Sequence, residues 1–128
     1  MPERLLIDTD VLIDYLRANA DAVSYVENIP DVPLISVITV AELHAGVREG
    51  SERTALTNFI EAFEIAPPTK QIATASGLYR RDFGASHGVS LNDALIAATA
   101  HVNNAELVTL NRKHFPMLAN VTVSYQKG

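Results

Sequence analysis

The chain has 128 residues, of which 48% are hydrophobic and 20% are charged, and it contains no cysteine. This composition is typical of a globular protein with its own core, and it excludes disulfide bridges and thiolate metal ligands. The formal net charge of −5 argues against tight non-specific binding of nucleic acid through a general positive field.

The even composition, with no linker rich in glycine, serine or proline, predicts a single domain over residues 1–128. No apolar run approaches the roughly 20 residues that a membrane-spanning helix needs. Residues 1–4 are followed by only three apolar residues, which is too few for a signal peptide. We therefore expect a cytoplasmic protein that does not associate with membranes.

The first predicted element is a short buried strand at residues 5–7, which ends where Asp8 follows it. Thr9 or Asp10 then caps a helix with one apolar face. In parallel α/β sheets, ligands bind at the carboxyl ends of the strands. The position of Asp8 therefore predicts where the functional site lies.

Helices and short strands alternate along the rest of the chain. The second predicted helix spans residues 20–29, and the third runs from Thr39 to a cap at Gly50. A fourth helix begins at Ser51, a fifth runs from Thr69 to the segment 84–88, and a sixth begins at Ser90. The predicted strands cover residues 33–36, 64–66, 106–110 and 121–123. This alternation favours a three-layer α/β/α fold with a mainly parallel sheet of four to five short strands.

Four polar side chains are expected to converge at one edge of this sheet. Asp8 and Asn111 each follow a buried strand, whereas Glu42 and Asp93 each lie in the first turn of a predicted helix. Crowded carboxylates repel one another, so such a cluster usually holds a divalent cation or a shared proton. Oxygen ligands favour Mg²⁺ or Mn²⁺, and helix N-terminal dipoles help keep Glu42 and Asp93 ionised.

Each of these acids also has a purely structural interpretation. Residues 39–42 match a capping box and residues 90–93 nearly match one, so Glu42 or Asp93 can simply bond to free backbone amides. Asp8 is harder to explain in this way, because an acid directly after a buried strand seldom begins such an apolar helix.

Other polar residues are interpreted as structural. Asp10 is expected to cap a helix, and Asp14 to be a solvated helix residue. The four histidines lack the spacing of a metal site, so they are interpreted as surface or packing residues; they are His44, His87, His101 and His114. No glycine-rich phosphate loop and no G-x-S-x-G motif is present.

Four motifs in order resemble those of the PIN-domain ribonucleases, and within that family the VapC-like toxins of bacterial toxin–antitoxin pairs. The matching stretches span essentially the whole chain and are residues 7–13, 36–43, 92–100 and 107–115. The resemblance implies a PIN-like fold with a cleft at the carboxyl edge of the sheet. It also implies that Asp8, Glu42 and Asp93 form the acidic metal site. The family often carries a further acid at the place of Asn111 or His114, and neither is acidic here.

The function implied by the resemblance is metal-dependent endoribonuclease activity on RNA phosphodiester bonds. Mg²⁺, with Mn²⁺ as a substitute, would be held by the three acids and would acidify a water for attack on the phosphate. Asn111 is counted with the catalytic residues, because it is expected to face Asp8 across the cleft. The resemblance further implies a homodimer and a cognate antitoxin protein that covers the cleft.

Three residues near Asn111 are candidates for supporting roles. Thr109 is expected to hydrogen-bond a ligand carboxylate or the phosphate, although threonine in a strand is often simply a β-former. Arg112 and Lys113 are expected to guide the RNA backbone.

Two other functions remain open from the sequence. Residues 8–10 are similar to the D-x-D motif of haloacid dehalogenase-type phosphatases, in which the first Asp is a nucleophile and the second an acid or base. Leu12, the missing lysine motif and the short chain depart from that pattern. The missing fourth acid leaves a non-catalytic PIN-like binding module as the other alternative.

Overall fold

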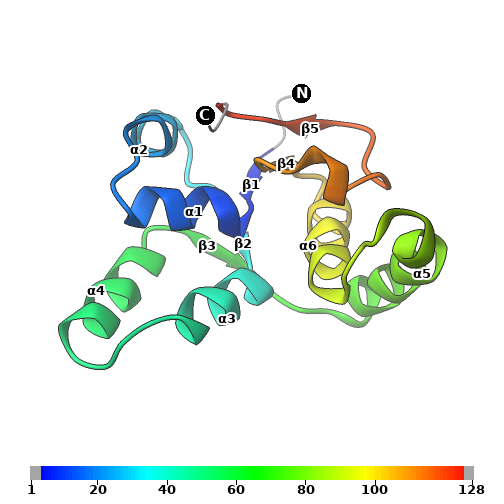
Figure 1. Ribbon diagram of the computed structural model, residues 1–128, viewed down its shortest axis with the longest axis horizontal. Coiled ribbons are helices and arrows are strands. Elements are labelled where there is room, and N and C mark those ends of the chain that lie inside the picture. The colour runs from blue at the N-terminus through cyan, green and yellow to red at the C-terminus, as the bar shows by residue number, and fades with distance from the viewer. Residues whose placement is uncertain (1–3, 126–128) are drawn as a thin grey trace.

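The computed structural model describes residues 4–125 of the chain, and within them five strands form one sheet. All strand pairs are parallel, and the strand order is β3–β2–β1–β4–β5 (Figure 1). The strands are β1 Leu5–Ile7, β2 Leu34–Ser36, β3 Glu64–Ala66, β4 Glu106–Val108 and β5 Val121–Thr122. The predicted parallel sheet is confirmed, and β2, β4 and β5 are shorter than predicted by one or two residues.

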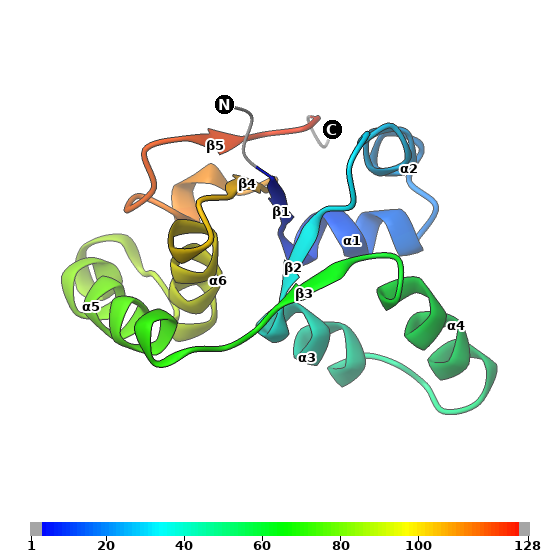
Figure 2. The same ribbon diagram turned by 180° about the vertical axis from the view of Figure 1, so that it is seen from behind.

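Helices cover both faces of this sheet. Those of the described residues are α1 Thr9–Leu16, α2 Ala20–Glu27, α3 Val37–Ala45, α4 Ser51–Ile60, α5 Lys70–His87, α6 Leu91–Val102 and the 3₁₀ helix η1 Arg112–His114. In both views, α1, α2 and α4 lie on one side of the sheet and α5 and α6 on the other (Figures 1 and 2). This is the predicted three-layer α/β/α fold.

Two apolar cores hold the layers together, one on each face of the sheet. Successive strand residues point to opposite faces, so Leu6 and Leu107 pack with α6, whereas Ile7 and Val108 pack with α1, α3 and α4. The α6 side is rich in small residues such as Ala97, which allow this helix to lie close to the sheet. None of the helices within residues 4–125 has the length and apolar character needed to cross a membrane.

Helix α3 begins earlier than predicted. Ser36, not Thr39, is its N-cap, and the Ser36 hydroxyl accepts from the Ile38 N–H at 3.0 Å. Ser36 is available for this role because it is the last residue of β2. Thr39 is fully buried inside the helix, so the capping box that was the structural alternative for Glu42 does not form.

The end of α3 also differs from the prediction. The helix ends at Ala45 with Gly46 as its cap, and Gly50 instead precedes α4. The φ angle of Gly50 is 100°, a conformation that favours glycine. The caps predicted at Thr69 and Ser90 are confirmed, because both hydroxyls accept a backbone N–H of the following helix.

Asp14 is buried, which contradicts its interpretation as a solvated helix residue. Its exposed fraction is 2%, and the Tyr125 hydroxyl donates to its Oδ2 at 2.9 Å. Burial and this hydrogen bond both raise the pKa of Tyr125, so the phenol stays protonated and remains a donor. A buried carboxylate needs such partners. The contact ties the end of the described chain to α1.

We expect Tyr125→Phe to lower the free energy of unfolding by about 1 to 2 kcal/mol, because it removes a donor from a buried charged acceptor. Urea denaturation at neutral pH measures this change. Tyr79→Phe is the matched control, since the half-buried Tyr79 hydroxyl forms no hydrogen bond with the described residues. An equal loss in both variants would contradict a specific role for the Asp14 contact.

Candidate active site

Asp8 lies at the junction between β1 and α1. Its N–H donates to the Val108 carbonyl at 2.9 Å, which continues the pairing of β1 with β4. Its Oδ1 accepts from the Thr9 N–H at 2.8 Å, so Asp8 itself is the N-cap that the sequence analysis assigned to Thr9 or Asp10. The residue is only 6% exposed. Asp8 is therefore a buried carboxylate at the carboxyl edge of the sheet.

Thr109 is the residue that lies beside Asp8. Ile7 pairs with Val108 in the sheet, so Asp8 and Thr109 leave their strands together. The Thr109 hydroxyl is fully buried and donates to Asp8 Oδ2 at 2.7 Å. The predicted hydrogen bond from Thr109 to a site carboxylate is thus present.

Asn111, which was predicted to face Asp8, lies two residues beyond Thr109, the residue beside Asp8 in the sheet register. The strand β4 ends at Val108 rather than at Leu110, so Asn111 lies beyond the end of the strand, is exposed and precedes η1. Among the described residues, Asn111 contacts the site through its backbone, because its N–H donates to Thr109 Oγ1 at 3.1 Å. Asn111 therefore supports the residue that holds Asp8.

Asp10 connects α1 to the segment that follows β4. Its Oδ1 accepts from the Val11 N–H at 2.7 Å, in agreement with a capping role. Its Oδ2 accepts from the Leu110 N–H at 3.0 Å, a contact that the sequence did not predict. Because backbone amides engage both oxygens, Asp10 is poorly placed for the acid–base role of a D-x-D phosphatase.

Glu42 reaches the site from the middle of α3 rather than from its first turn, because this helix begins at Val37. The Thr9 hydroxyl donates to Glu42 Oε1 at 2.7 Å and also contacts the Thr39 hydroxyl at 2.9 Å. Asn92, on the first turn of α6, donates to Glu42 Oε2 at 3.3 Å. The orientation of Glu42 is thus set by side chains from α1 and α6.

Asp93 lies in the first turn of α6, where its N–H donates to the Ser90 hydroxyl at 3.1 Å. His114 Nδ1 lies 3.4 Å from Asp93 Oδ2. His114 is exposed, in agreement with its interpretation as a surface residue, but the sequence analysis did not predict its contact with Asp93. The available signal was its place in the stretch 107–115, where the resemblance puts a further acid.

The acids of this site interact electrostatically. Burial and the charge of Asp10 raise the pKa of Asp8 to about 7, with a smaller contribution from Asp93, although hydrogen bonds from Thr109 and Thr9 oppose this shift. Burial also raises the pKa of Asp93, where His114 opposes the shift and the charge of Glu42 adds to it. The charge of Asp93 thus acts on Asp8 and the charge of Glu42 acts on Asp93, although the three acids belong to separate elements.

The chemistry of this donor set fits a divalent cation. All three side chains offer carboxylate oxygens, and a cation would offset the repulsion and burial that raise the pKa of Asp8 and Asp93. Within residues 4–125, no group of three or more His, Cys, Asp or Glu side chains forms a ready-made metal site. The three carboxylates would therefore have to turn toward a shared ion.

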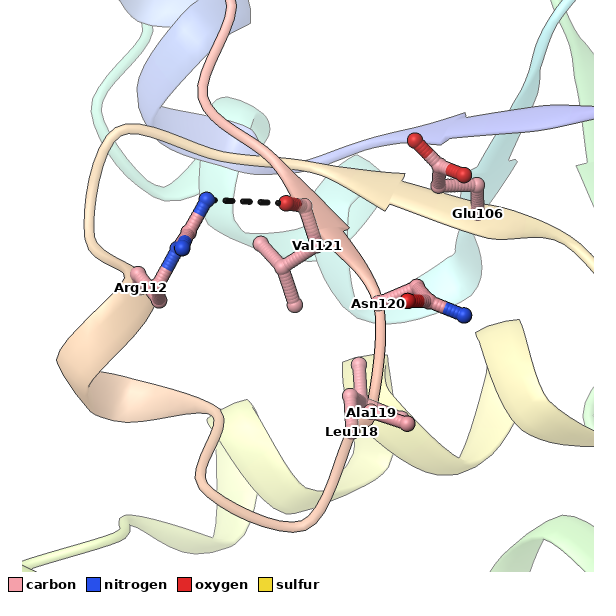
Figure 3. A pocket seen from close by; sticks show the side chains of 6 residues that line it. All are labelled: Glu106, Arg112, Leu118, Ala119, Asn120 and Val121. Atoms are coloured by element: carbon pink, nitrogen blue, oxygen red, sulfur yellow. Dashed lines mark hydrogen bonds between the residues drawn. The ribbon is translucent and has the colours of Figure 1, made fainter.

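Arg112 lies against the edge of the sheet rather than over the acids. Its Nη2 donates to the Val121 carbonyl of β5 at 3.2 Å (Figure 3). Its guanidinium borders a polar cavity of about 330 Å³ whose other lining residues are Glu106, Leu118, Ala119, Asn120 and Val121. Lys113 is exposed on η1. Guidance of RNA by Arg112 and Lys113 stays a prediction.

We expect Asp8→Asn to stabilise the metal-free protein. The raised pKa means that the folded state favours protonated Asp8, so stability falls as pH rises from about 4 to about 7. Asparagine carries no charge, so its gain should be absent near pH 4 and should approach about 4 kcal/mol at pH 8, because each pKa unit between about 4 and about 7 is worth about 1.4 kcal/mol. Urea denaturation in EDTA at both pH values measures the effect, with the exposed Asp31→Asn as control. Destabilisation at pH 8 would contradict this account.

The PIN domain family model matches residues 5–120 of the chain. Ribonuclease VapC10 of Mycobacterium tuberculosis is 41% identical over 116 residues, which cover 88% of this chain and 86% of that protein. Ribonuclease VapC19 of the same species is also 41% identical, over 124 residues that cover 94% of this chain and 98% of that protein.

Solved structures show the same fold. A toxin–antitoxin complex from Klebsiella pneumoniae contains a chain that superposes with a TM-score of 0.84 and 29% sequence identity, covering 96% of this chain and 99% of that chain. The family match spans the strands and helices that position Asp8, Glu42 and Asp93. The chain therefore belongs to the PIN domain family.

Proposed function

We propose that this chain is a metal-dependent endoribonuclease that hydrolyses RNA phosphodiester bonds and acts as the toxin of a toxin–antitoxin pair. The observation that supports the proposal is that Glu42 accepts hydrogen bonds from Thr9, which follows Asp8, and from Asn92, which precedes Asp93, in a chain that belongs to the PIN domain family. Relatives named ribonucleases, at 41% identity over most of the chain, support RNA as the substrate.

The three acids would hold Mg²⁺, or Mn²⁺ in its place, which supplies the charge that activates water and neutralises the phosphate. The protein contributes the orientation of its carboxylates. Both oxygens of Asp8 accept hydrogen bonds, from Thr9 and Thr109, and Glu42 is bonded on both oxygens as well. These hydrogen bonds restrict the rotamers of Asp8 and Glu42, which reduces the entropy lost when the acids turn toward an ion.

The alternatives have less support. A D-x-D phosphatase needs Asp10 as an acid or base, yet backbone amides engage both of its oxygens. A non-catalytic binding module would have no use for three acids whose burial and mutual repulsion raise the pKa of Asp8 and Asp93. The site is better suited to a cation and a phosphate.

A second cavity supports a protein partner next to the site. It has a volume of about 460 Å³, lies between α1, α3 and α4, and is bordered by Glu42; its apolar lining includes Ile13, Leu16, Leu43, Val47 and Leu56. An antitoxin segment that fills this cavity would lie against a site acid. The solved complex from Klebsiella pneumoniae, a toxin–antitoxin assembly, supports such a partner. The homodimer implied by the family resemblance stays a prediction.

We expect the protein to cleave members of a panel of structured RNAs in Mg²⁺ and to leave them intact in EDTA. Glu42→Gln keeps an acceptor for Thr9 but removes a charge, so cleavage should fall by about 100-fold or more while the thermal midpoint changes little. Gel assays of the cleaved RNA measure the loss. Glu61→Gln, an exposed change next to α4, is the control.

Two results would contradict the proposal. Undiminished cleavage in EDTA would exclude the metal-dependent mechanism. Binding of RNA without cleavage in Mg²⁺ or Mn²⁺ would favour the non-catalytic module.

A further inference from the structure

The backbone of His114 lies next to α6, the helix that carries Asp93. It is the last residue of η1, and its N–H donates to the Asn111 carbonyl at 3.0 Å. The next residue, Phe115, is 1% exposed and packs in the same core as α6. The burial of Phe115 therefore fixes where the His114 backbone lies relative to α6.

The imidazole of His114 contacts one specific atom of the site. Its Nδ1 lies 3.4 Å from Asp93 Oδ2, and the two side chains are 52% and 24% exposed. Among the described residues, His114 is the one basic group within ion-pair distance of Asp8, Glu42 or Asp93. The contact joins η1 to the first turn of α6.

Asp8 and Glu42 are each oriented by a hydrogen bond from a side chain of another element. Asp8 is held by Thr109 from the segment after β4, and Glu42 by Thr9 from the start of α1. In each case a donor from another element restricts the rotation of the carboxylate. For Asp93, the corresponding side chain from another element is His114.

We propose that His114 is a positioning residue, which restrains Asp93 Oδ2 through its Nδ1 and so limits the rotamers from which Asp93 can meet a cation shared with Asp8 and Glu42. This role rests on the function proposed above. At 3.4 Å the contact lies within ion-pair distance and is longer than the hydrogen bonds on Asp8 and Glu42, and the proposed role requires the Nδ1 N–H to donate to Asp93 Oδ2 when the acid binds an ion. Groups that orient ligand carboxylates typically change metal affinity or activity about 10-fold to 100-fold when they are removed.

Two amide substitutions separate this role from direct contact with RNA. The amide nitrogen of asparagine can replace Nδ1, whereas that of the longer glutamine can replace Nε2. If His114 acts through Asp93, His114→Asn should retain the wild-type behaviour and His114→Gln should not. If His114 acts on RNA through Nε2, the order should reverse.

The experiment is calorimetric titration of the full chain with Mn²⁺, together with steady-state cleavage of RNA. We expect His114→Ala and His114→Gln to bind Mn²⁺ about 10-fold more weakly than the wild type, and His114→Asn to bind it almost as well. The kcat should fall in the first two variants, and KM for RNA should stay nearly constant. His101→Ala, an exposed change in the last turn of α6, is the control.

Each other result has a distinct meaning. Unchanged Mn²⁺ affinity in His114→Ala, or rescue by glutamine instead of asparagine, would overturn the positioning role and leave the proposed function intact. A wild-type protein that binds no Mn²⁺ at millimolar concentration would contradict the proposed function itself, and the role of His114 with it.

Discussion

The parallel pairing of β1 with β4 is the constraint on which the rest of the site depends. Because Ile7 lies opposite Val108, Asp8 and Thr109 leave the sheet side by side, and the hydroxyl reaches the carboxylate at 2.7 Å. Asp10 secures the same junction through the Leu110 N–H. A shift of one residue in this register would turn alternate side chains to the opposite face and separate the pair.

The junction between β1 and α1 places the carboxylate of Asp8 in a buried environment. Hydrogen bonds from Thr9 and Thr109 offset only part of the cost, so the pKa of Asp8 stays near 7. The metal-free fold therefore carries a local instability that a bound cation would relieve. Ligand binding and folding stability are coupled in such a site, because any ion that prefers the folded state stabilises it.

The three acids come from different elements, and each is oriented by contacts with a further element. The Thr109 hydroxyl, just after β4, donates to Asp8. Side chains of α1 and α6 donate to Glu42. Asp93 contacts the His114 side chain of η1. The position of each carboxylate thus depends on the packing of other elements against the two cores of the sheet. This explains why buried residues such as Phe115 bear on the geometry of a polar site.

The sequence by itself determined the α/β class, the parallel sheet and the caps at Thr69 and Ser90, because these follow from local apolar patterns and capping residues. It also predicted Asp8, Glu42 and Asp93 as the candidate acids of the site. Only the tertiary structure decided which partners those acids have. Thr109 rather than Asn111 lies beside Asp8, and Asp14 is buried because Tyr125, 111 residues later, donates to it. Such contacts depend on strand register and on how elements dock across the sheet, which local spacing along the chain does not encode.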